Sequence, residues 1–478
     1  MANCYKSKEK ISLTMKKNVL LIQPKFFENF HIKPPIPLMY IAAVLENNGF
    51  NVTIIDTNIE KDYIKKITDY IKNKKPEYVG ISVMIGLQII SAKLISQKIK
   101  KTNPQTNIVW GGPFPTCEYE LVIKEPYVDI VVIGEGEDTF LELVKNKDKN
   151  LIKGIIYKNK NKIVLNTSRE IIDINQLPPP AFHLVKMKKY QAAYVHMTRG
   201  CPFKCSFCHI SSTGPFRGKT PEKMMEEVSL IIRNGFTKID FRGEAQLCNK
   251  QIIETFCSLI RKNNLSLTWT SWAHVKYLKN KEYVRMLAAN GLRQVLIGVE
   301  SYSTEKRREL KKYFSNEELF QTLKNCKEAG IYAILIFIIG YPKQRKDDIN
   351  KILDFADLIE KQYGFQSLIS VYKNYPLTKL SKRHRKKNLE EWAYTPFFIK
   401  SINRAPKNIN TLECISHSFH YKQIYEEINK SRASLMIKFL RFIATKRCKY
   451  RMWKFPVEIY LKKIKILGSV FIEKIKLI

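Results

Sequence analysis

The sequence of 478 residues lacks long hydrophobic runs and is poor in cysteine and in acidic side chains. Its longest apolar run, Ile331 to Ile339, is far shorter than the roughly 20 residues that a membrane-spanning helix needs. No secretory signal is predicted, because the N-terminus shows no apolar stretch followed by a cleavage site. Ten cysteines are too few for a disulfide scaffold in so long a chain, so we expect a reducing, cytoplasmic compartment.

The shortage of acidic residues leaves 44 Asp and Glu against 82 Lys and Arg, a formal net charge of +38. Residues 381–478 contain 23 basic and 7 acidic side chains and so carry +16 of that charge. Within them, residues 457–478 repeat apolar side chains at three- and four-residue steps, which is typical of a basic amphipathic helix. We expect this helix to pack within the protein, to pair with a second subunit, or to lie on anionic lipid at the inner membrane face. Nucleic-acid binding is not expected, because no recognition module accompanies the charge.

The chain length predicts roughly two to four domains, at about 150 residues per domain. We interpret residues 1–15 as a flexible arm. In residues 16–148, apolar runs alternate with amphipathic stretches, which predicts an α/β domain with a doubly wound parallel sheet of the flavodoxin-like kind. Residues 149–180 read as a small hairpin and a proline-rich linker, since Pro178 to Pro180 continue neither helix nor sheet.

Residues 181–380 contain a second alternating series. Strands are expected at 193–198, 238–241, 267–272, 294–299, 332–339 and 367–372, and helices at about 221–233, 250–263, 281–290, 316–329 and 346–362. Six such units predict a partial (β/α)6 barrel of the TIM type, with its chemistry at the C-terminal ends of the strands. Residues 381–478 are expected to form a helical C-terminal region.

Three cysteines, Cys201, Cys205 and Cys208, follow the first strand of this second series with Cys-x3-Cys-x2-Cys spacing. Three thiolates from one short loop predict a metal site, either zinc or an iron–sulfur cluster. Zinc needs a fourth protein ligand, and His209 is awkwardly placed for a tetrahedral site because it directly follows a ligand. The other seven cysteines are scattered, mostly in apolar contexts, and are interpreted as small buried hydrophobic residues.

The cysteine loop, with the aromatic Phe207 before its third cysteine, resembles the signature of the radical S-adenosylmethionine (SAM) superfamily. The resemblance implies a 4Fe–4S cluster with one iron open to SAM, whose reductive cleavage by an external electron donor yields a 5′-deoxyadenosyl radical. It also implies SAM contacts at strand ends, although Arg242 replaces the first glycine of the Gly-Gly-Glu element of the family. The implied SAM-binding residues are Phe207, Gly243, Glu244, Glu300 and Gly340.

The first domain resembles the cobalamin-binding domain that precedes many radical SAM enzymes. The residues implied to bind cobalamin are Pro35, Leu38, Ser82, Gly111, Gly112, Gly134, Glu135 and Gly136. Glycines at strand ends let the backbone approach a large flat cofactor at the carboxyl edge of the sheet. The Asp-x-His-x-x-Gly loop of some cobalamin proteins is absent, so no histidine is expected below cobalt unless His31 supplies it. The alternative is a nucleotide-binding or purely structural domain.

Together these motifs predict a cobalamin-dependent radical SAM enzyme that transfers a methyl group to an unactivated carbon of a small metabolite, lipid, sugar or natural-product intermediate. A rearrangement, cyclisation or oxidation with the same cofactors is the first alternative. A non-catalytic cobalamin or iron–sulfur sensor is the second. No catalytic residue is assigned beyond the cluster ligands. The lack of a second cysteine cluster argues against the tRNA methylthiotransferases and against peptide-modifying relatives.

Overall fold

The computed structural model describes most of the chain up to residue 380. The described residues are 17–26, 33–145, 147–160, 162–190, 192–210, 214–242, 247–342, 344–372, 375, 377–380, 388–389, 443 and 446. The predicted arm 1–15 and the predicted basic helix 457–478 lie outside these ranges. Within the region 381–478, Leu389 is described, and it is buried with the core of the first domain.

The first domain is built on one seven-stranded sheet with the order β2-β1-β3-β4-β5-β6-β7. Its strands are β1 (Asn18–Gln23), β2 (Asn51–Asp56), β3 (Tyr78–Ser82), β4 (Asn107–Gly111), β5 (Ile130–Val132), β6 (Ile155–Asn159) and β7 (Lys162–Leu165). The first five strands are parallel, as predicted for a doubly wound domain. Their carboxyl ends therefore share one edge of the sheet, where such folds place their ligands.

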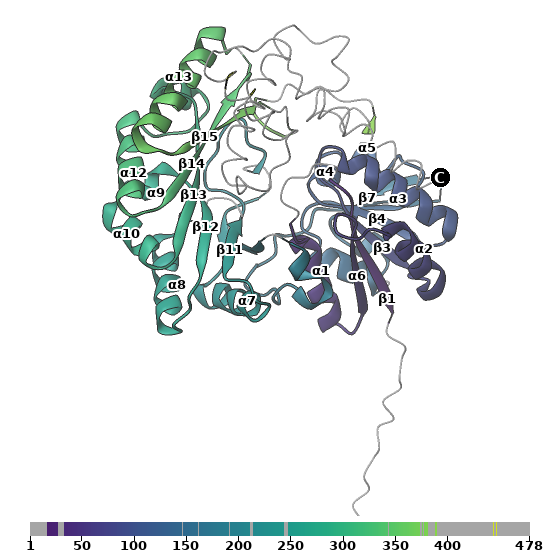
Figure 1. Cartoon of the computed structure of the whole chain (residues 1–478). Helices are drawn as coiled ribbons and strands as arrows, with labels where there is room; N and C mark the ends of the chain where they lie inside the picture. Colours follow the sequence, from purple (N-terminus) through teal and green to yellow (C-terminus); the bar gives the residue numbers. More distant parts are fainter. Residues whose placement is uncertain are drawn as a thin grey trace, which may run out of the picture.

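Helices cover both faces of this sheet (Figure 1). They are α1 (Ile36–Asn47), α2 (Tyr63–Lys74), α3 (Gln88–Thr102), α4 (Pro113–Cys117), α5 (Tyr119–Val122) and α6 (Glu137–Val144). The side chains of β1 alternate between two cores, with Val19 and Leu21 in one and Leu20 and Ile22 in the other. This two-residue period explains why the strand is apolar throughout: both of its faces are buried.

The hairpin predicted at residues 149–180 is part of this sheet, which makes the sheet mixed. Strand β6 pairs antiparallel with β5, and β7 pairs antiparallel with β6. Ile155, Ile156 and Tyr157 are all buried, so β6 has apolar neighbours on both faces and closes the edge that β5 would otherwise leave open. The sequence pattern alone showed a hairpin but not the strand with which it pairs.

The second domain is an open parallel sheet with the order β15-β14-β13-β12-β11-β8. Its strands are β8 (Ala193–His196), β11 (Lys238–Arg242), β12 (Thr268–Ala273), β13 (Leu292–Glu300), β14 (Tyr332–Ile339) and β15 (Gln366–Val371). The helices are α7 (Pro221–Arg233), α8 (Lys250–Lys262), α9 (Val275–Leu278), α10 (Lys281–Ala289), α11 (Thr304–Glu309), α12 (Asn316–Glu328) and α13 (Lys346–Tyr363). The predicted α/β fold class, with its parallel sheet in the second domain, is confirmed.

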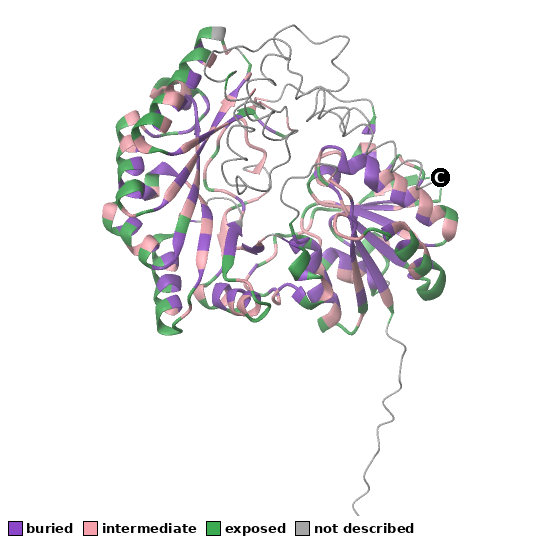
Figure 2. Ribbon diagram, in the orientation of Figure 1, coloured by how far each residue is buried: buried purple, intermediate pink, exposed green. Residues whose placement is uncertain are grey.

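The outer face of this second sheet carries the core of the domain, because α8, α10, α12 and α13 pack against it (Figure 1). In β14, Ala333, Leu335, Phe337 and Ile339 are buried, whereas the alternate residues are half-buried. Figure 2 shows the same division, with exposed residues on the outer sides of the helices. The inner face of the sheet is therefore available for a site. No helix in the described part of the chain combines the length and apolar character needed to cross a bilayer.

Candidate active site

The three predicted cluster cysteines lie in a loop whose two ends are joined at a narrow neck. Strand β9 (Thr198–Arg199) precedes the loop, β10 (Arg217–Gly218) follows it, and the two pair antiparallel. Gly200 adopts a φ of +71°, and a Cβ at this position would overlap the backbone of Pro215. Only glycine fits there, so the neck depends on the residue that directly precedes Cys201.

Cys201, Cys205 and Cys208 are all half-buried, and a turn brings the last two together, since the Cys208 amide donates to the Cys205 carbonyl at 3.2 Å. Burial raises the pKa of Cys205 to about 11. Among the described residues, no three His, Cys, Asp or Glu side chains converge on one point that could hold a single metal ion. In an iron–sulfur cluster each thiolate binds its own iron, so the thiols need not converge in this way. This donor set fits a 4Fe–4S cluster.

The cysteine loop is held against three strand ends of the second domain. The Ser206 amide donates to the Leu310 carbonyl after β13, and the Ser206 carbonyl accepts from Leu380 after β15, both at 3.0 Å. The ring of Phe203 stacks on His274, directly after β12, with centroids 4.1 Å apart and planes 14° apart. The loop therefore lies at the C-terminal edge of the sheet, where barrel enzymes of this type place their chemistry.

Glu300, a predicted SAM contact, ends β13 and is buried beside the cysteine loop. Its Oε1 accepts from the Nζ of Lys312 at 2.7 Å, and Lys312 is also buried. Burial alone would lower the pKa of Lys312, but the charges of Glu300 and Cys205 outweigh it, so that pKa lies above its ordinary value. A Cβ at Gly298 would clash with both side chains, so this glycine makes room for the ion pair.

Arg307 holds the segment that carries Lys312. It is fully buried, and it donates to the Ser301 carbonyl at 2.8 Å and to the Oδ1 of Asn316 at 2.6 Å. Its guanidinium also lies 4.5 Å from the ring centroid of Phe314. The sequence reasoning missed both Arg307 and Lys312, because a basic residue in a segment rich in Lys and Arg gives no sign of burial.

The other predicted SAM contacts are only partly described. Phe207 is half-buried in the cysteine loop. Gly340 directly follows β14 with a φ of +80°, and its amide donates to the side chain of Gln344. Gly243 and Glu244 lie outside the described residues.

The predicted cobalamin residues gather mainly at the carboxyl edge of the first sheet. Ser82 ends β3, Gly111 ends β4, and Gly112 has a φ of +97°. A Cβ at Gly112 would lie 3.1 Å from the Val83 carbonyl oxygen and 3.2 Å from the Oγ of Ser82. The backbones of these two strand ends therefore approach closely, and the positive φ of Gly112 also disfavours any residue with a side chain there.

The turn after β5 continues this edge. Gly134 has a φ of +86°, and a Cβ there would meet no atom within 4 Å, so the turn borders open space. At Gly136 a Cβ would come within 3.3 Å of the Ile41 side chain. Pro35 precedes α1 and is buried, and the Leu38 side chain packs in the core of the domain. Gly111, Gly112 and Gly134 thus form a glycine edge that fits a flat cofactor, whereas Leu38 acts in packing.

Glu135, also predicted to face cobalamin, instead binds the neck of the cysteine loop. Its Oε1 accepts from Arg199 and from Arg217, each at 2.9 Å, and its Oε2 accepts a second bond from Arg217 at 3.0 Å. Burial alone would raise the pKa of Glu135, but the two arginines outweigh it and hold the pKa below its ordinary value. Arg199 also donates to Glu137 at 2.6 Å. The two domains are therefore joined beside the cluster loop.

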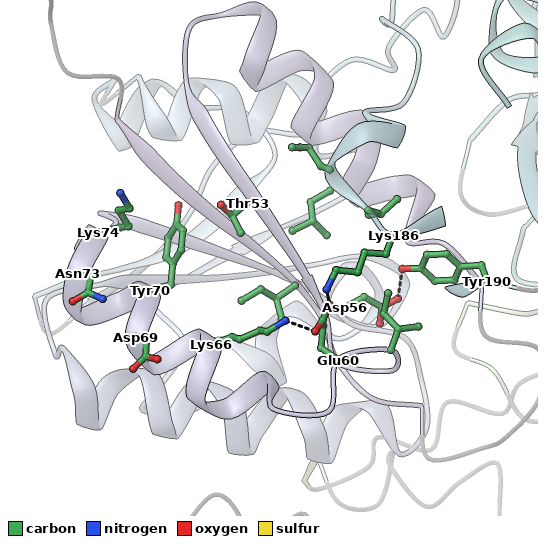
Figure 3. A pocket seen from close by; sticks show the side chains of 15 residues that line it. Thr53, Asp56, Glu60, Lys66, Asp69, Tyr70, Asn73, Lys74, Lys186 and Tyr190 are labelled. Carbon is green, nitrogen blue, oxygen red and sulfur yellow. Dashed lines mark hydrogen bonds and ion pairs between the residues drawn. The ribbon is translucent and has the colours of Figure 1, made fainter. Parts of the chain in front are cut away.

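A groove with a volume of about 490 Å³ lies elsewhere, between β2, α2 and the linker before β8 (Figure 3). Two contacts between the first domain and this linker border it: Tyr190 donates to Asp56 at 2.9 Å, and Lys186 pairs with Glu60 at 2.9 Å. It contains none of the predicted site residues, so we do not assign it to the cofactor site.

Comparison with known proteins gives two family matches. Residues 31–144 match the B12 binding domain, and residues 195–356 match the Radical SAM superfamily. An uncharacterized methyltransferase of Pyrococcus horikoshii is 30% identical over 361 residues, which cover 73% of this chain and 77% of that protein. The anaerobic magnesium-protoporphyrin IX monomethyl ester cyclase of Rubrivivax gelatinosus is 27% identical, and the match covers 68% of this chain but only 62% of the cyclase.

Solved structures share the fold. The radical SAM methyltransferase TsrM from Kitasatospora setae, with cobalamin and a 4Fe–4S cluster bound, matches with a TM-score of 0.66 and 16% identity over 77% of this chain and 74% of that one. The cobalamin-dependent radical enzyme OxsB matches with a TM-score of 0.65 and 19% identity over 77% and 54%. The chain belongs to the radical SAM superfamily, in the group that carries a B12-binding domain. It is a cobalamin-dependent radical SAM enzyme, and the predicted cofactors, cobalamin, a 4Fe–4S cluster and SAM, are confirmed at the level of this family.

Proposed function

We propose that this enzyme transfers a methyl group to an unactivated carbon of a small molecule. The observation that carries the proposal is the junction at Glu135, where the neck of the cysteine loop meets the glycine edge of the first domain. When bound, the cluster and SAM supply a carbon-centred radical and cobalamin supplies the methyl group. The methyltransferase relative in Pyrococcus horikoshii supports this reaction class.

The roles of the residues follow from their places. Cys201, Cys205 and Cys208 would hold the cluster. Glu300 and Gly340, at neighbouring strand ends, would orient SAM beside it, together with Phe207 from the loop. Gly243 and Glu244 are proposed for the same role from the sequence alone. In the first domain, Ser82, Gly111, Gly112 and Gly134 would face the flat cofactor, and Pro35 and Gly136 would shape the turns around it.

A small-molecule substrate is proposed because the reacting groups would meet between two domains that close contacts hold together, as at Tyr40 and Glu227, whose side chains bond at 2.7 Å. One fold neighbour, TsrM, was solved with tryptophan as its substrate. The predicted external electron donor stays a prediction, and so does the membrane contact of the tail.

Cyclisation or oxidation without net methyl transfer is the second candidate, because the cyclase relative of Rubrivivax gelatinosus shares 27% identity. The mass of the product separates the two reactions. A gain of one methylene unit supports methyl transfer, and an unchanged mass or a loss of hydrogen supports the alternative. Membership of an enzyme family weighs against a sensor that never turns over.

The test is anaerobic purification and reconstitution, followed by metal analysis and by assay of 5′-deoxyadenosine with a strong reductant. The wild type should bind about four irons per chain and form 5′-deoxyadenosine. Cys205→Ala should do neither. Cys117→Ala, which removes a half-buried thiol of the first domain, is the matched control and should behave as the wild type. Zinc without iron, or equal nucleoside formation by Cys205→Ala, would overturn the proposal.

A further inference from the structure

The neck of the cysteine loop is docked on the first domain by two arginines that bind one carboxylate. Arg199 and Arg217 are directly paired across the β9–β10 ladder, one at each end of residues 200–216. Both donate to Glu135, which also accepts from the Ile172 amide at 3.2 Å. Side-chain exposure is 19% for each arginine and 26% for Glu135, so water only partly screens the pairs.

The geometry restrains direction as well as distance. Arg217 binds both oxygens of Glu135 through its two terminal nitrogens, at 3.0 and 2.9 Å. A planar guanidinium that binds a carboxylate in this way tolerates little rotation, unlike the ammonium group of lysine. Arg199 divides its donors between Glu135 and Glu137, so it bridges both sides of the turn that starts α6. Cys201 stands only two residues from this anchor.

We propose that Glu135, Arg199 and Arg217 are positioning residues that set the distance between the cluster loop and the glycine edge of the first domain. The inference rests on the proposed function, in which groups held by different domains must meet at one substrate. A misplacement of about 1 Å costs on the order of 100-fold in rate when reacting groups must align. In the proposed function the residues that hold the cluster and SAM all belong to the second domain. A loosened neck should therefore impair methyl transfer more than cleavage of SAM.

A second buried contact keeps the domains together when the neck is loosened. Lys219, directly after β10, donates to the Tyr40 hydroxyl and to Glu227, and Tyr40 donates to Glu227 at 2.7 Å. All three side chains are buried. A variant at Glu135 therefore retains this junction, and we expect it to fold.

The test compares Glu135→Gln with Glu142→Gln. Glu142 lies in the same domain, has 22% side-chain exposure and binds Arg169 and Lys147, but both of these partners belong to the first domain. In the unloaded chain, hydrogen exchange over residues 198–219 should be about tenfold faster in Glu135→Gln, because charge-assisted bonds are lost. In the reconstituted enzyme, its ratio of final product to 5′-deoxyadenosine should fall by about tenfold or more, whereas its melting temperature should fall by only about 2–4 °C. Arg217→Lys keeps the positive charge but lacks the planar guanidinium that binds both oxygens of Glu135. Its exchange rate and its product ratio should lie between those of wild type and Glu135→Gln.

Unchanged exchange and an unchanged product ratio in Glu135→Gln would overturn the inference. Equal effects of Glu142→Gln would overturn it as well, because they would reflect general electrostatics of the first domain. If the wild type forms 5′-deoxyadenosine and a product without an added methyl group, the proposed methyl transfer fails. The positioning role is then judged by the ratio of that other product to 5′-deoxyadenosine and by the exchange data.

Discussion

Lys312 and Glu300 form a buried ion pair at the mouth of the second domain, with the Nζ of Lys312 and the Oε1 of Glu300 2.7 Å apart. The lysine comes from the segment after β13 and the glutamate from the end of β13 itself, so the pair closes a short loop over the cysteine site. Such pairs are costly to break on one side only, because the remaining charge stays buried without a partner.

Lys312→Met should therefore destabilise the protein by about 3–5 kcal/mol, the range seen when one partner of a buried pair is removed. Urea unfolding of the unloaded chain measures this change. Lys281→Met removes the lysine of a surface pair with Glu328 and should leave the unfolding midpoint almost unchanged. A similar midpoint for the two variants would show that the Glu300 pair does not stabilise the fold.

Gly200→Ala should abolish iron binding, because its Cβ would overlap the Pro215 backbone and force the neck of the cysteine loop apart. Gly235→Ala is a matched control, since Gly235 has a φ of +85° but no atom lies within 4 Å of its Cβ position. It should cost only the strain of a left-handed residue, about 1–2 kcal/mol, and retain iron. The test is the number of irons per chain in each variant after reconstitution. Full iron occupancy in Gly200→Ala would contradict the prediction.

His274 should make the protein less stable in acid. Burial, with help from Lys312 and Lys276, lowers the pKa of its imidazole to about 3, so the folded protein keeps this ring neutral. The unfolded chain takes up the proton below about pH 6.5, so stability falls as the pH drops, by up to roughly 1.4 kcal/mol per unit. His274→Phe should flatten this part of the pH profile of the unfolding free energy. Equal slopes for wild type and variant between pH 7 and 5 would refute it.

Cys248 should not be a cluster ligand, although Cys201 is near enough to influence it electrostatically. A 4Fe–4S cluster that keeps one iron open for SAM takes three cysteine ligands, and Cys201, Cys205 and Cys208 of the cysteine loop already supply three. Cys248→Ser should keep the full iron content and the visible spectrum of the reconstituted enzyme. Cys208→Ala should lose both, and a loss of iron in Cys248→Ser would instead make Cys248 part of the site.

Much of the fold could be predicted because its signals are local. Runs of apolar residues set the strands, and amphipathic spacing placed α7, α8, α10, α12 and α13 within about one residue of their bounds. The short helices α9 and α11 were not predicted, because a helix of four to six residues shows too little periodicity. The pairing of β6 with β5 could not be predicted. The alternation of apolar and polar residues in a hairpin indicates its two strands but not the sheet edge to which the hairpin adds.

Glu135 shows the same limit at the site. Its position after β5, among glycines, indicated a place at the carboxyl edge of the sheet, and it lies there. Its partners, Arg199 and Arg217, are more than 60 residues away in the chain, and no local pattern connects them. Sequence position placed the residue, and long-range contact determined what it binds.

By itself, the sequence determined the chemistry of this protein: three cysteines at a spacing that only a short loop can bring together, and glycines where a backbone must pass without a side chain. These are covalent and local facts, so they can be seen before the chain folds. The tertiary structure decided how the two halves are joined. The neck of the cysteine loop is joined to Glu135 by contacts between segments far apart in the chain, whose free energy exists only after the chain has folded. Arg307 and Lys312 bond to nearby residues of the chain, but their burial exists only in the folded protein.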